Sequence, residues 1–127
     1  MNRWSSLALA LALCATAASA EWTAVGGGDQ IYVPYADQAT IGALGANVSM
    51  AGLYDFRKGD QTPEGEPFRS TVVLREYDCQ GRQVRLLSYI DFSGPMGTGS
   101  VVTTVNRVGR WEPIVERALD QAYWRIA

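Results

Sequence analysis

The feature that most constrains the fold is a pair of β-rich segments, Arg69–Cys79 and Arg82–Phe92, separated only by Gln80-Gly81. Both contain many β-branched and aromatic residues, and the short link is typical of a hairpin turn in which Gly81 takes a positive φ. A two-residue turn predicts three cross-strand pairs: Tyr77 with Val84, Leu74 with Leu87, and Glu76 with Arg85. Large apolar side chains occupy both faces of this hairpin, so another element must cover the second face.

Further short segments also favour strands. They are Glu21–Val25, Gln30–Pro34, Asn47–Phe56 and Ser100–Val105. Pro34 either stops its strand or places it at a sheet edge. In the third segment apolar residues alternate, although Leu53 breaks the pattern. The polar, turn-rich segment Arg57–Pro67 predicts a mobile surface loop.

The pattern changes to helical spacing over Pro113–Ile126, where Pro113 suits a first helical turn. This helix is the natural cover for the second face of the hairpin. The predicted fold is therefore α+β: a meandering antiparallel sheet of about six strands with one C-terminal helix packed on one face.

The first residues predict export. Arg3 precedes the apolar run Leu7–Leu13, and small residues follow up to Ala18-Ser19-Ala20. This order is that of a signal peptide cleaved between Ala20 and Glu21. The run is too short to cross a membrane, so no membrane span is expected. We predict a signal peptide over residues 1–20 and one domain over residues 21–127, located in the periplasm, at the cell surface or outside the cell.

The composition argues against most catalytic chemistry. The chain contains no histidine, which removes the commonest general base and most catalytic zinc sites. Its net charge is −2 and its charges are scattered, so nucleic acid is not an expected partner. Glu76 and Asp78 share one face of a strand and could form a hydrolytic carboxylate pair, but an arginine-paired polar face is the simpler interpretation. We predict no catalytic residue, no metal and no cofactor.

Cys79 is the only cysteine that remains after the predicted cleavage, so it cannot form a disulfide within the mature chain. Three states are open to it: a free thiol, a buried and inert thiol, or a disulfide with another molecule.

Several motifs in a fixed order resemble one known family. They are Glu21-Trp22 at the mature start, Pro67-Phe68-Arg69-Ser70, Arg75-Glu76-Tyr77-Asp78-Cys79, Leu87-Ser88-Tyr89, Ser93 to Gly99 (SGPMGTG), and Trp111-Glu112-Pro113-Ile114. In this order they resemble the surface-adhesin protein E family of Gram-negative bacteria, over nearly the whole mature chain.

The resemblance implies an antiparallel sheet with a C-terminal helix, export, and binding of host matrix or plasma proteins such as vitronectin and laminin. It also implies a second cysteine just past the helix that pairs with the one matching Cys79. The printed chain has none after Trp124, so we expect its helix to be held more loosely.

The leading functional hypothesis is a non-catalytic binding module of the cell envelope with an unknown protein ligand, for which the resemblance implies a host extracellular-matrix protein. Its first candidate contacts are Arg57 and Lys58 in the loop Arg57–Pro67, together with the exposed sheet face. The alternative is a periplasmic structural or stress-associated protein of unknown partner, with a homodimer made possible by edge strands near Gln30–Pro34 and by Cys79. A small hydrolase that uses Glu76 and Asp78 is a third hypothesis.

Overall fold

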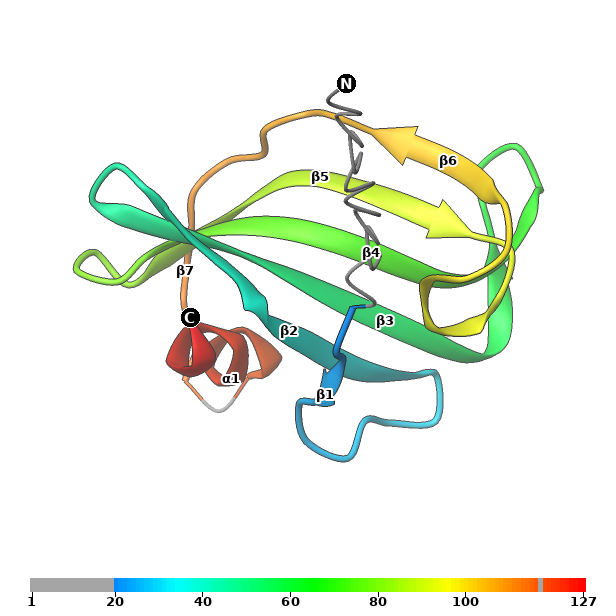
Figure 1. Ribbon diagram of the computed structural model, residues 1–127, viewed down its shortest axis with the longest axis horizontal. Helices are drawn as coiled ribbons and strands as arrows, with labels where there is room; N and C mark the ends of the chain where they lie inside the picture. Colours follow the sequence, from blue (N-terminus) through cyan, green and yellow to red (C-terminus); the bar gives the residue numbers. More distant parts are fainter. Residues whose placement is uncertain (1–19, 117) are drawn as a thin grey trace, which may run out of the picture.

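A computed structural model describes residues 20–116 and 118–127. In this part the chain forms one antiparallel sheet and one C-terminal α-helix, which confirms the predicted α+β class (Figure 1). The elements are β1 (Thr23–Ala24), β2 (Tyr32–Leu44), β3 (Asn47–Gln61), β4 (Pro67–Asp78), β5 (Gln83–Phe92), the 3₁₀ turn η1 (Pro95–Gly97), β6 (Val101–Val105), β7 (Glu112–Pro113) and α1 (Leu119–Ile126). The first six strands lie in chain order and β7 pairs with β5, so the sheet is a meander.

The central hairpin of β4 and β5 has the predicted register near its turn. Tyr77 lies opposite Val84 and Glu76 lies opposite Arg85. The third predicted pair is wrong, because a bulge after Leu74 places that residue opposite Ser88.

The turn of this hairpin spans residues 79–82 rather than two residues. Arg82, not Gly81, takes the positive φ, at 53°. The backbone N–H of Gly81 donates instead to a carboxylate oxygen of Asp78, at 2.8 Å. The Asp78 side chain thus stabilises a longer turn than the two-residue turn that was predicted.

Strands β2 and β3 are longer than the sequence predicts. Pro34 lies inside β2, opposite Tyr54, and its carbonyl accepts a hydrogen bond from the N–H of Val25. A proline is tolerated here because β1 covers only a short part of this edge. The predicted loop Arg57–Pro67 is also shorter: β3 continues to Gln61 after a bulge, β4 begins at Pro67, and only residues 62–66 connect them.

The C-terminal helix is shorter than the predicted Pro113–Ile126. Pro113 belongs to β7 and lies opposite Gln83, and the N–H of Ile114 donates to the carbonyl of Arg82 at 2.9 Å. The chain therefore follows the edge of β5 before it turns into α1. Val115, which the periodicity places on the buried side of a helix, is 57% exposed.

The main core lies between α1 and one face of the sheet, called here the helix face. Its buried side chains include Met50, Tyr77, Val84 and Tyr123. Tyr123 lies directly over Gly52, where a Cβ atom would come within 3.1 Å of the tyrosine ring. The hydroxyl of Tyr123 donates to the carbonyl of Tyr35 at 2.7 Å, which ties α1 to β2 as well. The helix thus covers the face predicted for it.

The opposite face of the sheet is covered in part by the loop that contains η1. Leu53 points to this face and is fully buried, and Gly97 of the loop packs against Leu53 and Val72. The hydroxyl of buried Ser70 accepts a hydrogen bond from the N–H of Gly97 and donates to the carbonyl of Gly94. The break in alternation at Leu53 therefore marks a second, smaller core. In Figure 1, α1 and this loop lie toward opposite ends of the sheet.

We predict that Tyr123→Ala destabilises the domain by about 3–5 kcal/mol, because it removes a buried aromatic ring and leaves a cavity over Gly52. Tyr123→Phe keeps the ring and loses only the hydrogen bond to Tyr35, so it should cost about 1 kcal/mol. Urea unfolding monitored by circular dichroism measures both values. Equal losses for the two variants would contradict this account of the helix–sheet core.

Candidate functional site

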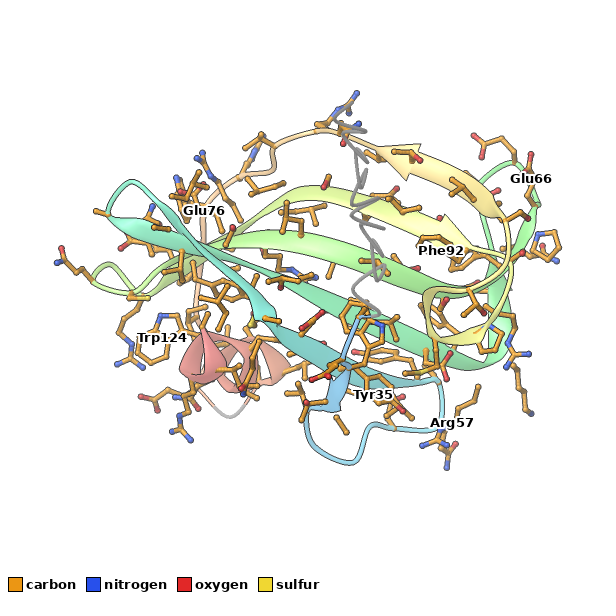
Figure 2. All side chains as sticks on the ribbon, in the orientation of Figure 1. Tyr35, Arg57, Glu66, Glu76, Phe92 and Trp124 are labelled. Carbon is orange, nitrogen blue, oxygen red and sulfur yellow. The ribbon has the colours of Figure 1, made fainter. Side chains whose placement is uncertain are left out.

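The two predicted contact residues, Arg57 and Lys58, lie near the end of β3. Figure 2 shows Arg57 at the end of the molecule away from Trp124. Arg57 is exposed but engaged: its N–H donates to the carbonyl of Ile31, and its Nε donates to the carbonyl of Asp29 at 2.8 Å. Arg57 therefore holds the connection between β1 and β2 in place. Lys58 is exposed and makes no hydrogen bond or ion pair within the described residues, so it is the freer of the two cations.

Lys58 lines a cavity of about 350 Å³ at this end of the sheet, called here the tip cavity. Its lining residues are Lys58, Gly59, Asp60, Gln61, Pro67, Phe68, Arg69 and Ser93. Phe68 supplies apolar surface, and Lys58 and Arg69 outnumber the single carboxylate of Asp60. Residues 62–66 join Gln61 and Pro67 of this lining, and all of them except buried Thr62 are exposed. A concave, mixed apolar and basic surface of this kind suits a protein ligand better than it suits acid–base catalysis.

A row of aromatic rings leads from the tip cavity toward α1. Phe68 contacts Phe56, Phe56 contacts Tyr32, and Tyr32 contacts Tyr54, all edge to face, with ring centroids between 4.9 and 5.8 Å apart. Tyr54 then contacts Tyr123 of the helix at 6.4 Å. The aromatic row makes this face rigid, because edge-to-face pairs fix the relative orientation of their rings.

Asp91 is a buried carboxyl group that the sequence analysis did not single out. It accepts a hydrogen bond from the hydroxyl of Thr71 at 2.7 Å, and burial raises its pKa, with the nearby charge of Asp60 adding to the effect. The sequence could have indicated this pair, because Thr71 and Asp91 are polar residues within two apolar strands that were predicted to pair. One carboxyl group paired with one hydroxyl provides no general acid and base pair.

Glu76 and Asp78 do not form a hydrolytic pair. Glu76 is only 4% exposed, and its carboxylate accepts hydrogen bonds from Nδ2 of Asn47 at 2.9 Å and from Nε of Arg85 at 2.8 Å. These contacts lower its pKa, the bond from Asn47 most of all. The carboxylate of Asp78 accepts a hydrogen bond from the N–H of Gly81 in the turn. The structure thus favours the arginine-paired interpretation.

The guanidinium of Arg85 also lies over the indole ring of Trp111, with 4.4 Å between Cζ and the ring centroid. Trp111 belongs to the segment between β6 and β7. The ion pair of Arg85 with Glu76 therefore anchors that segment to the central hairpin as well.

Cys79 lies exposed in the turn between β4 and β5 and forms no disulfide within the described residues. The buried state is thereby excluded. Within residues 20–116 and 118–127 there is also no group of three or more cysteine, aspartate or glutamate side chains able to hold a metal ion. In the same part of the chain, no helix is long and apolar enough to cross a membrane.

Comparison with known proteins identifies the family. A sequence profile described as surface-adhesin protein E matches residues 22–127. The chain belongs to the surface-adhesin protein E family. No curated protein sequence matches it significantly.

Solved structures of Haemophilus influenzae protein E share the fold of this chain. One crystal structure, from a non-typeable strain, is 14% identical, with a TM-score of 0.58, and the match covers 76% of this chain and 75% of that one. A second crystal form is 13% identical, with a TM-score of 0.62 and coverage of 79% and 88%. The selenomethionine form is 12% identical, with a TM-score of 0.60 and coverage of 85% and 93%. At these identities the likeness shows the fold and not the ligand.

Membership of an adhesin family favours a non-enzymatic role. Residues 1–19 of the predicted signal peptide lie outside the described residues. The signal peptide and its cleavage between Ala20 and Glu21 therefore stay a prediction.

We predict that Glu76→Gln destabilises the domain by about 1–3 kcal/mol at pH 7, because it removes the charge from a buried, hydrogen-bonded carboxylate. The folded pKa of Glu76 lies below the ordinary value of 4.5, so the charged carboxylate stabilises the fold above that pH and ceases to do so as the pH falls through the folded pKa. The difference between variant and wild type should therefore shrink in acid.

Urea unfolding across the range from neutral to acidic pH measures this difference. Glu64→Gln, in the exposed loop of residues 62–66, is the matched control and should change stability little at any pH. A destabilisation by Glu76→Gln that stays constant with pH would contradict the role given to the charge.

Proposed function

We propose that this chain is an exported cell-envelope module that binds a protein partner through the tip cavity and the loop of residues 62–66. The observation that carries the proposal is the family match over residues 22–127. The resemblance implies host matrix or plasma proteins as partners. The proposal places the protein at the cell surface, because adhesion requires display there.

Within the tip cavity, Lys58 is the contact best suited to an acidic patch on the partner, since it has no partner within the described residues. Arg57 is less suited, because its side chain already holds the connection between β1 and β2. Phe68, which also lines the cavity, supplies the apolar surface that a protein interface needs at its centre.

We expect the full mature chain to bind at least one member of an immobilised panel of host matrix proteins. Lys58→Glu should slow association about three- to tenfold at low salt, because it reverses a charge at the proposed contact. Arg107→Glu makes the same charge change in the exposed connection between β6 and β7 and should leave association unchanged. Surface plasmon resonance measures both rates.

Absence of binding to the whole panel at micromolar concentration would remove the adhesin interpretation. Equal slowing of association by the two variants would show that Lys58 acts only through the net charge of the protein, and would contradict a direct contact. Cell fractionation followed by protease treatment of intact cells tests display independently: a product protected from protease until the outer membrane is broken would place the protein in the periplasm.

A second candidate function is self-association through the sheet edges, as a structural component of the envelope. The outer edge of β6 contains no charged residue or proline, and its Val101 is 58% exposed. Residues 38–44 of β2 are similarly uncharged and lie beyond the short pairing with β1. Edges without such protection pair readily with another strand.

If β6 mediates a homodimer, Val101→Lys should convert it to monomer, because it places a charge on the pairing edge. Val115→Lys changes an equally exposed valine, 57% against 58%, away from both edges and should have no effect. Light scattering coupled to gel filtration under reducing conditions measures the mass. A wild-type chain that is monomeric at high concentration would exclude this function.

A further inference from the structure

Arg75 is a partly buried cation on the helix face that has no acidic partner. Strand alternation turns its side chain to the face of Tyr77 and away from that of Glu76, and it lies between Met50 and Leu86 on the neighbouring strands. Its guanidinium carbon lies 5.5 Å from the centroid of the Tyr54 ring. Within the described residues no carboxylate lies within 4.0 Å of it, whereas Arg85 on the other face has Glu76.

A guanidinium keeps its charge at every physiological pH, so Arg75 cannot lower its burial cost by losing a proton. The ring of Tyr54 and the hydroxyl groups of Tyr54 and Tyr77 compensate only in part, because contacts of a cation with neutral groups are weaker than a hydrogen-bonded ion pair. A bound anion would complete the set of partners.

Arg75 lines a cavity of about 350 Å³ between the sheet, the start of α1 and the segment that joins β6 to β7. The volume is at the small end of the range for ligand sites in proteins. Arg110 contributes a second cation, and the third, Arg85, is already paired with Glu76. Val84 and Leu86 contribute apolar surface, and the N–H of Gly109 donates to the carbonyl of Leu86 at 2.7 Å on one side of the cavity. The cavity is distinct from the tip cavity, with which it shares no lining residue.

The two carboxylates that line the same cavity, Glu112 and Asp120, limit the charge of a ligand. A dianion such as phosphate would be repelled by both of them more strongly than a monoanion would be. The planar fork of an arginine matches the two oxygens of a carboxylate. The apolar surface of Val84 and Leu86 suits an aliphatic group attached to that carboxylate.

We infer that this cavity binds a carboxylate monoanion with an aliphatic group, held by Arg75 and Arg110 with its apolar part against Val84 and Leu86. The carboxylate belongs either to a free small acid or to the C-terminus of a peptide. This inference does not depend on the adhesin proposal.

The test is an NMR titration of the mature chain at constant ionic strength, read from the amide signals of Gly109 and Leu86. The probes are 4-methylpentanoate for a small acid, N-acetylleucine for a peptide C-terminus, and N-acetylleucinamide and inorganic phosphate as comparisons. We expect saturable shifts with one or both carboxylates, none with the amide, and weaker binding of phosphate. Binding of N-acetylleucine alone would assign the site to a peptide C-terminus, and binding of 4-methylpentanoate would admit a free acid.

Two substitutions should change the affinity in opposite directions. Arg75→Gln should weaken binding of the carboxylate about tenfold or more, because it removes a charged hydrogen-bond donor. Asp120→Asn should strengthen binding about threefold by removing a repelling charge, and it leaves the buried core intact. Arg107→Gln, outside the cavity, is the control and should do neither.

Equal shifts with N-acetylleucine and N-acetylleucinamide would overturn the inference, as would binding of phosphate at least as tight as that of the carboxylates. Unchanged or weakened binding in Asp120→Asn would also overturn it, even if Arg75→Gln failed to fold.

Discussion

The sheet can hold its single helix closely because β3 has no side chain at position 52. The ring of Tyr123 occupies the space above Gly52, and from there its hydroxyl reaches the carbonyl of Tyr35 on the next strand. One aromatic side chain therefore joins α1 to two strands, one of them through a hydrogen bond. The helix has only eight residues and no side-chain cap at its start, so tertiary packing of this kind must supply most of its stability.

Alternation along β4 explains how two adjacent charged residues come to different environments. Glu76 faces the side where Asn47 and Arg85 are within hydrogen-bonding distance, whereas Arg75 faces the aromatic side and a cavity. The first is a satisfied buried group that secures the hairpin and, through Trp111, the chain beyond β6. The second has neutral tyrosine partners and, within the described residues, no acidic one. The same strand thus carries a structural charge on one face and a charge available to a ligand on the other.

The sequence predicted the elements whose signal is local and repeated. The register of the central hairpin follows from Tyr77 and Val84 facing the same core, and the α+β class follows from one change of period near the C-terminus. It did not predict that Pro113 would pair with β5, because that contact depends on the path that the chain takes after the end of β6.

The candidate site was predicted less well for the same reason. Lys58 was found from its polar surroundings. The hydrogen bond of Arg57 to Asp29 and the packing of Arg75 against Tyr54, by contrast, depend on neighbours distant in the chain.

The turn between β4 and β5 has a practical consequence. It holds the exposed thiol of Cys79, and Arg82 of the same turn lies over the indole of Trp124 in α1. A fluorophore attached to that thiol would lie in the turn that contacts the docked helix, so its emission is expected to change when the helix is released.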